Sequence, residues 1–91
     1  TSTPIFLEGK PQRELDVRGF YGDDAIEAVD KFIDSATVSG LHRIDIIHGK
    51  GTGVLRKRIN SYLQSDKRIK SHRLGEWNEG GAGVTVVELK D

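Results

Sequence analysis

The chain has 91 residues, with 14 basic and 14 acidic side chains, so its formal net charge is zero at neutral pH. This length suits one domain with a modest core and leaves no room for a second. The absence of cysteine excludes disulfides and thiolate zinc sites, and no apolar run approaches a membrane span or a signal peptide. We therefore expect one soluble domain of the cytoplasm.

The charges are unevenly distributed along the chain. Residues 1–41 carry four basic and eight acidic side chains, residues 42–73 carry nine and two, and residues 74–91 carry one and four. All three histidines also lie in the basic middle third. Clustered positive charge attracts polyanions such as nucleic acid. A solvated helix face is the alternative interpretation of the same composition.

The first 13 residues contain both prolines and the apolar triplet Ile5–Leu7, with no periodicity. We interpret residues 1–13 as an N-terminal arm or linker and residues 14–91 as the domain itself. Because the chain begins with Thr1 rather than methionine, we expect it to be part of a longer protein.

Residues 14–18 alternate in polarity, which predicts a half-buried strand. Leu15 and Val17 would face the core, and Asp16 and Arg18 would share the polar face. This pair is either part of a charged site or an exposed ion pair that contributes little to stability.

A helix is predicted after the turn at residues 19–22. Asp24 and Glu27 have the spacing of a capping box, so the helix should begin near Asp24 and end before Gly40. Its apolar residues recur with the spacing of one buried stripe: Ile26, Val29, Phe32, Ile33 and Ala36.

Residues 43–48 form the second predicted strand, with Ile44 and Ile46 on one face. His48 falls at its C-terminal end, where open α/β sheets bind their ligands. A metal site of His42, Asp45 and His48 is disfavoured because Asp45 would point to the opposite face from the two histidines.

Three glycines alternate with polar residues in His48-Gly49-Lys50-Gly51-Thr52-Gly53, directly after this strand. Glycine permits close backbone approach, so the amides of Gly49, Gly51 and Thr52 could converge on a phosphate. Thr52 is the predicted N-cap of a helix over residues 54–65, whose positive dipole end would face the same anion.

Lys50 would add a mobile positive charge to this turn, and His48 a group that exchanges protons near neutral pH. The spacing matches neither a Walker A loop nor the dinucleotide-binding fingerprint. A tight strand-to-helix turn without a ligand is the alternative interpretation.

The rest of the chain predicts one helix and two strands. Helix 54–65 buries Leu55, Ile59, Tyr62 and Leu63 and exposes three cations, Arg56, Lys57 and Arg58. The strand at 69–74 bears Lys70, His72 and Arg73, and a further strand covers 84–89. Between them, Trp77 lies in a glycine-rich loop, where we favour a lid over the core and keep base stacking as the alternative.

The resulting order is βαβαββ, which predicts an α/β fold with a mixed four-stranded sheet and two helices. The βαβ units imply some parallel pairing with right-handed crossovers. The last two strands would form an antiparallel hairpin.

Three segments together carry a family resemblance: Leu15-Asp16-Val17-Arg18-Gly19, the glycine turn at 48–53, and Gly83-Val84-Thr85-Val86-Val87. In this combination the chain resembles the Smr (small MutS-related) domain, in the form found at the C-terminus of the second bacterial MutS-type paralogue. The resemblance implies a two-layer sandwich similar to the C-terminal domain of translation initiation factor three. It also implies endonuclease activity on DNA or RNA within a dimeric, MutS-like ATPase.

Many stand-alone members of this family have histidine where Arg18 stands. A base assigned to that position does not transfer to this chain, because arginine stays protonated at neutral pH.

Residues and resemblance together give one hypothesis: a nucleic-acid-binding domain with endonuclease activity in DNA repair, recombination or ribosome rescue. His48 would transfer protons, Arg18 would neutralise transition-state charge, and Asp16 would orient a partner or accept a proton. We predict no metal ligands and no evident cofactor, and leave dependence on a divalent ion such as magnesium open. The alternative is a module that docks on nucleic acid or the ribosome without cutting. Predicted nucleic-acid contacts are Gly49, Lys50, Gly51, Thr52, Gly53, Arg56, Lys57, Arg58, Lys70, His72 and Arg73.

Overall fold

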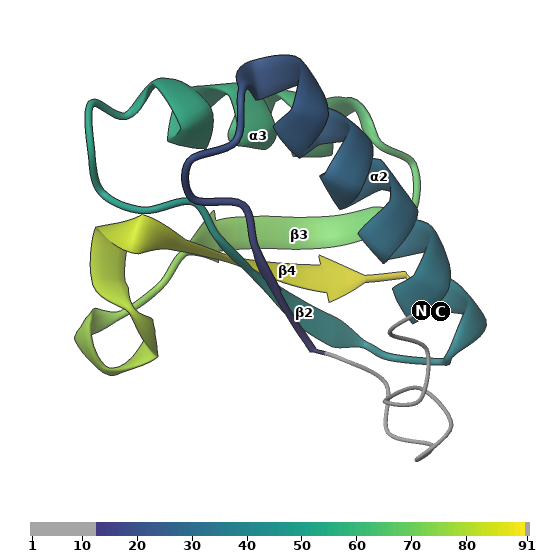
Figure 1. Ribbon diagram of the computed structural model, residues 1–91. Coiled ribbons are helices and arrows are strands. Elements are labelled where there is room, and N and C mark those ends of the chain that lie inside the picture. The colour runs from purple at the N-terminus through teal and green to yellow at the C-terminus, as the bar shows by residue number, and fades with distance from the viewer. Residues whose placement is uncertain (1–12, 91) are drawn as a thin grey trace, which may run out of the picture.

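The computed structural model describes residues 13–90, and the predicted arm at 1–13 lies almost wholly outside them. The chain forms a two-layer α/β sandwich in the predicted βαβαββ order. Figure 1 shows both helices over one face of the sheet. The elements are β1 (Glu14–Asp16), α2 (Gly22–Val38), β2 (Arg43–Ile47), α3 (Val54–Ser65), β3 (Ile69–Leu74), the 3-10 turns η1 (Trp77–Glu79) and η2 (Gly81–Gly83), and β4 (Val84–Leu89).

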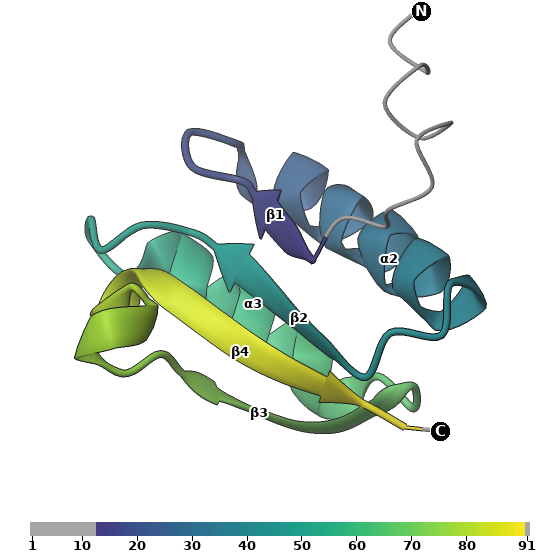
Figure 2. The ribbon, with the colours of Figure 1, turned by 90° about the horizontal axis from the view of Figure 1, so that it is seen from below.

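The sheet has the strand order β1-β2-β4-β3. β1 runs parallel to β2, whereas β4 is antiparallel to both β2 and β3, so the predicted mixed sheet and terminal hairpin are confirmed. Since β1 and β2 are parallel neighbours, the segments that follow them leave the sheet at the same end (Figure 2). The glycine turn after β2 therefore lies beside the residues that follow β1.

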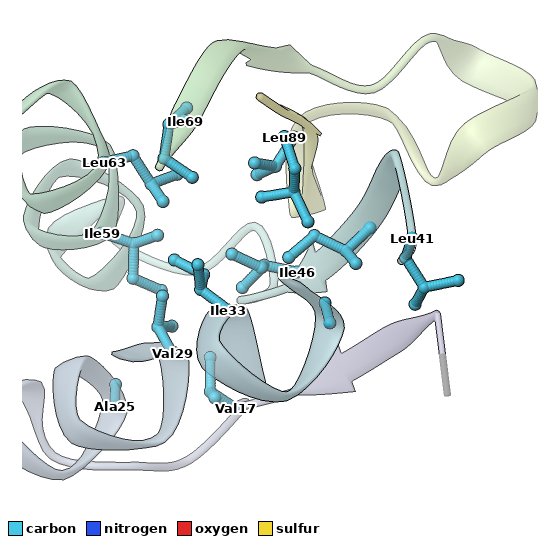
Figure 3. Packing of buried hydrophobic residues seen from close by; sticks show 13 residues of the cluster. Val17, Ala25, Val29, Ile33, Leu41, Ile46, Ile59, Leu63, Ile69 and Leu89 are labelled. Carbon is cyan, nitrogen blue, oxygen red and sulfur yellow. The ribbon is translucent and has the colours of Figure 1, made fainter. Parts of the chain in front are cut away.

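The core lies between the two helices and the sheet, as Figure 3 shows. Val29 and Ile33 of α2 and Ile59 of α3 are fully buried against Ile46 and Leu89 of the sheet. The predicted stripes are confirmed, with Ile26, Phe32, Leu55 and Tyr62 partly buried at the edges of the cluster. Their spacing puts these apolar side chains on the helix face that covers the sheet, whereas Val38 at the end of α2 and Val54 at the start of α3 are exposed.

The start of α2 differs from the prediction. The helix begins at Gly22, its N-cap is Tyr21, and no side chain caps it, so the capping box at Asp24 and Glu27 is wrong. The amide of Ala25 donates to the Tyr21 carbonyl at 2.8 Å and so sets the first helical turn earlier. Asp24 instead lies in the first turn, where its charge favours the helix dipole.

The loop before β4 also differs from the prediction. Trp77 is 90% exposed, so it is not a lid on the core. Glu79 holds this loop instead, because its carboxylate accepts from Arg73 at 2.7 Å and from Arg43 at 3.3 Å. Arg43 lies on β2 and Arg73 on β3, the two strands that flank β4, so one carboxylate fastens η1 across the face that the helices leave uncovered.

No helix in the described part of the chain is long and apolar enough to cross a membrane.

Candidate functional site

The glycine turn is anchored by one carbonyl. The backbone oxygen of Gly83 accepts from the amides of His48 at 3.0 Å and Gly49 at 2.9 Å. The predicted role of the Gly49 amide in holding a phosphate is therefore wrong, because that amide is already occupied. Gly49 has a φ of 84°, a conformation that glycine adopts without a steric penalty.

Two of the three predicted amides remain available. Gly51 and Thr52 are exposed, and their backbone N–H groups donate to no other residue within 13–90. The helix begins at Val54 as predicted, but its N-cap is Gly53 (φ 85°), so the prediction of Thr52 as N-cap is wrong. The Thr52 hydroxyl accepts only a long hydrogen bond, 3.4 Å, from the Val54 amide. Unpaired amides at a helix N-terminus are suited to bind an anion.

Two cations lie beside these amides. The Arg56 guanidinium folds back over the turn, with Nη2 2.9 Å from the position that a Cβ on Gly53 would occupy. Lys50 is exposed, and its side chain lies against Gly81 and Gly83. Neither Lys50 nor Arg56 has an ion-pair partner among the described residues, so both charges are available to a ligand.

Arg58 is less available, because its guanidinium is paired with Asp23 at the start of α2. This ion pair joins the N-terminal ends of α2 and α3. Between them lies a pocket of about 410 Å³, lined by residues 19–22, 48–56 and Arg58. The free amides, Arg56 and both helix N-termini thus border one concave surface.

Asp16 and Arg18 meet the turn from the β1 side, as predicted. Arg18 donates to Asp16 through Nε at 3.0 Å and Nη2 at 2.6 Å, and its backbone amide donates at 3.0 Å. These hydrogen bonds, that from the guanidinium above all, lower the pKa of Asp16 to about 2. The Arg18 side chain crosses over Gly49, where an added Cβ would lie 3.3 Å from Arg18 Cγ. The pair is exposed, ionised and held next to the turn.

Arg18, but not Asp16, lines a second pocket, of about 630 Å³, on the uncovered side of the sheet. Arg18 lines it together with Glu14, Asp45 and Glu79. Gly49 and Lys50 line both pockets, so they form the ridge between the charged pair and the free amides.

His48 is placed differently from the prediction. The side chain is 5% exposed, and both ring nitrogens are hydrogen-bonded within the fold. Nδ1 lies 3.0 Å from the Gly49 carbonyl, which can only accept, so Nδ1 carries the hydrogen. Nε2 then accepts from the Thr85 hydroxyl at 2.8 Å. Neither ring nitrogen is therefore free for the predicted proton transfer. The ring instead stabilises the turn through these two hydrogen bonds.

The hydrogen bonds continue from Thr85 into α3. Asn60 Nδ2 donates to the Arg56 carbonyl at 2.8 Å and reaches Thr85 Oγ1 at 3.4 Å. Asn60 Oδ1 accepts from His72 Nδ1 at 3.1 Å. The four side chains His48, Thr85, Asn60 and His72 therefore form one directed network beneath the turn, which we call the turn-support network.

Sequence reasoning missed Thr85 and Asn60. Thr85 is a polar residue within the apolar run of β4, and Asn60 is a polar residue next to the buried Ile59 in α3; the sequence offers no further indication. His72 is half-buried and bonded to Asn60, so the prediction that it contacts nucleic acid is not supported.

The remaining predicted cations do not extend the site. Arg73 is paired with Glu79, and Lys57 is exposed on α3. β3 runs in the same direction as β2, because both are antiparallel to β4, so Lys70 near its start lies at the end opposite the turn. The basic middle third is thus divided among separate surfaces rather than forming one continuous strip.

No group of three or more His, Asp or Glu side chains within residues 13–90 is arranged to hold a metal ion.

Comparisons with known proteins agree on one family. The family model described as Smr domain matches residues 15–90. Endonuclease MutS2 of Acetivibrio thermocellus is 58% identical over 77 residues, which cover 85% of this chain and 10% of that protein. The chain therefore spans about a tenth of the length of such curated relatives.

Solved structures agree with this. The Smr domain of Thermus thermophilus MutS2 is similar at a TM-score of 0.85 and 42% identity, covering 87% of this chain and 99% of that one. The stand-alone small MutS-related protein YdaL of Escherichia coli has a TM-score of 0.83 at 23% identity, covering 99% of this chain and 76% of that one. At that identity the second likeness concerns the fold alone.

Proposed function

The chain belongs to the Smr domain family, and from this premise we propose that it binds a polynucleotide by its phosphates and hydrolyses a phosphodiester bond. The observation that carries the proposal is the pair of free amides at Gly51 and Thr52, flanked by unpaired Lys50 and Arg56. Backbone N–H groups at a helix start bind phosphate oxygens, and neighbouring cations strengthen that binding. Relatives named endonuclease MutS2 support the nuclease assignment.

The proposed chemistry belongs to the β1 side of the ridge. Water attacks phosphorus, the bond to the leaving sugar oxygen breaks, and negative charge builds on the oxygens in between. Arg18, oriented by Asp16 beside Gly49, would stabilise that charge. Asp16, an ionised carboxylate held by Arg18, would also accept the proton of the attacking water, and the leaving sugar oxygen takes a proton from solvent. His48 acts as a positioning residue that keeps the Gly49 carbonyl fixed.

Single-turnover cleavage of labelled single-stranded RNA, duplex DNA and branched DNA tests this assignment, with affinity measured in parallel. Each assay is run with magnesium and with EDTA. We expect Arg18→Met and Asp16→Asn to cut at least about 100-fold more slowly, as loss of a transition-state contact predicts, while affinity changes little. His48→Gln should weaken binding and cleavage together, because it disturbs the turn. Cleavage that survives both Arg18→Met and Asp16→Asn would refute the catalytic assignment.

A second candidate function has its own support. Both His48 ring nitrogens are hydrogen-bonded within the fold, so few groups beside the turn can transfer a proton. The free amides and cations that would bind a phosphate do not depend on such a group. We propose as the alternative a docking module that recruits a larger protein to branched DNA or ribosomal RNA without cutting. Under this alternative the wild type binds all three labelled substrates and cleaves none of them, with or without magnesium.

The lengths of the relatives support a proposal about the parent protein. Because the matched region is 10% of each such relative, we propose that this domain acts within a larger, dimeric MutS-like ATPase engaged in DNA repair, recombination or ribosome rescue. Light scattering and ATP hydrolysis assays on the full-length parent test the dimer and the ATPase. A monomeric parent without ATPase activity would contradict the proposal.

A further inference from the structure

Three exposed apolar side chains gather at the pocket between the helix starts. Among residues 13–90, six large apolar side chains are exposed, and Phe20, Tyr21 and Val54 of these line the 410 Å³ pocket. Tyr21 is 83% exposed and Phe20 is 45% exposed. Exposed apolar side chains that cluster at one concavity indicate a binding surface more strongly than isolated ones do.

The backbone that carries the two rings is held in place. Gly19, with a φ of 84°, turns the chain after Val17, and the Phe20 amide donates to the Val17 carbonyl at 3.1 Å. Tyr21 is the N-cap of α2, and its carbonyl accepts from Ala25. The rings are therefore presented from a fixed turn, which lowers the entropy cost of ordering them around a ligand.

The wall of the same pocket that the glycine turn and Arg56 form is polar and positive. It contains the free amides of Gly51 and Thr52 and the unpaired Arg56. A ligand that satisfies both walls has a flat apolar part and an anionic part. The pocket volume of about 410 Å³ is in the range of sites that bind small molecules.

We propose that Phe20 and Tyr21 form a stacking site for one unpaired nucleobase, next to a phosphate of the same strand at Gly51 and Thr52. Aromatic side chains stack on bases of any sequence, whereas in a duplex the base faces are already stacked on their neighbours. The domain therefore prefers single-stranded or extruded nucleotides over intact duplex. This inference rests on the proposed phosphate binding and adds the substrate class.

Fluorescence anisotropy tests the inference with three labelled probes: a single-stranded 12-mer, the same strand with abasic sites throughout, and a duplex hairpin closed by a non-nucleotide linker. Tyr21→Ala should weaken binding of the normal single strand by at least about fivefold, the effect of losing one stacked base. For the abasic strand and the hairpin, the affinity of Tyr21→Ala should stay within about twofold of wild type. Tyr21→Phe should restore binding of the normal single strand. Trp77→Ala is the matched control, because Trp77 is 90% exposed but lies outside the pocket, and it should bind like wild type.

The outcomes separate this inference from the proposed function. If Tyr21→Ala binds the normal single strand like wild type while Lys50→Ala and Arg56→Ala weaken it, the phosphate site stands and the stacking site is wrong. Equal wild-type affinity for the normal and abasic strands would also contradict the stacking site. Phe20 and Tyr21 would then be assigned to contact with a protein partner. If wild type binds none of the probes, the proposed function itself fails. Circular dichroism melting of each variant identifies any loss that comes from misfolding.

Discussion

At the scale of single residues, Gly49 is where the parts of the site meet. Its amide donates to Gly83, its carbonyl accepts from His48, and the Arg18 side chain lies across it. The residue also lines both pockets, so any distortion there reaches the free amides on one side and the charged pair on the other.

Gly49→Ala should therefore cost stability and activity together. A side chain at a φ of 84° is strained by about 1–2 kcal/mol, and the new Cβ would press on Arg18 Cγ. Urea unfolding and single-turnover cleavage measure the two losses. Gly51→Ala is the matched control, because an added Cβ there meets nothing within 4 Å. Equal unfolding midpoints for the two variants would contradict the strain argument.

Thr85 tests the turn-support network at the same scale. Thr85→Val keeps the shape but removes the hydroxyl that donates to His48 Nε2, leaving a buried acceptor unsatisfied. We expect a loss of about 1–3 kcal/mol in the free energy of unfolding, and nitrogen NMR of the His48 ring should show a changed tautomer balance. Thr85→Ser, which retains a hydroxyl, should recover part of the loss. A His48 ring spectrum that is identical in Thr85→Val and wild type would disprove the network.

At the scale of elements, residue spacing was sufficient to locate most of the fold. Helix 54–65 and strands 69–74 and 84–89 begin and end where the sequence pattern predicted them. The loop that contains Trp77 depends instead on a partner distant in sequence. A local pattern could not reveal that Glu79 fastens the loop by contacting Arg43 and Arg73.

This loop predicts a pH dependence. Hydrogen bonds from Arg73, and then from the Glu76 amide, lower the pKa of Glu79 from 4.5 to about 2. A lowered folded-state pKa means that the ionised form stabilises the fold above pH 4.5, and this contribution is lost as the pH falls towards about 2. Urea unfolding of wild type and Glu79→Gln should differ most at pH 6 and converge as the pH falls to about 2. Glu27→Gln, on the exposed surface of α2, is the control. Its difference from wild type in urea unfolding should not change with pH in this way.

The candidate site could be predicted only in part for the same reason. The family resemblance put Asp16, Arg18 and the glycine turn in one hypothesis, and the parallel pairing of β1 and β2 brings them together in the structure. The sequence could not show that the Gly83 carbonyl occupies the Gly49 amide or that Thr85 engages His48, because both contacts come from the last strand and the turn before it.

At the scale of the whole molecule, the fold divides the basic third of the sequence. Arg58 and Arg73 are paired with carboxylates, and Lys70 lies at the far end of the sheet, so few cations face the turn. With about two phosphate contacts, from Lys50 and Arg56, the logarithm of single-strand affinity should fall with the logarithm of salt at a slope of about −1.4. Anisotropy titrations over a range of salt concentrations measure it. A slope near zero would show that no phosphate contacts form. A slope of −4 or steeper would show that the basic residues form one continuous binding strip.

The most direct test of the central claim is a ¹H–¹⁵N NMR titration of the domain with a short single-stranded oligonucleotide. If the start of α3 holds a phosphate, the amide protons of Gly51 and Thr52 should move strongly downfield, while the Gly49 amide, already bonded to Gly83, should move little. Unchanged Gly51 and Thr52 resonances at saturating oligonucleotide, with the largest shifts on β3, would contradict the claim.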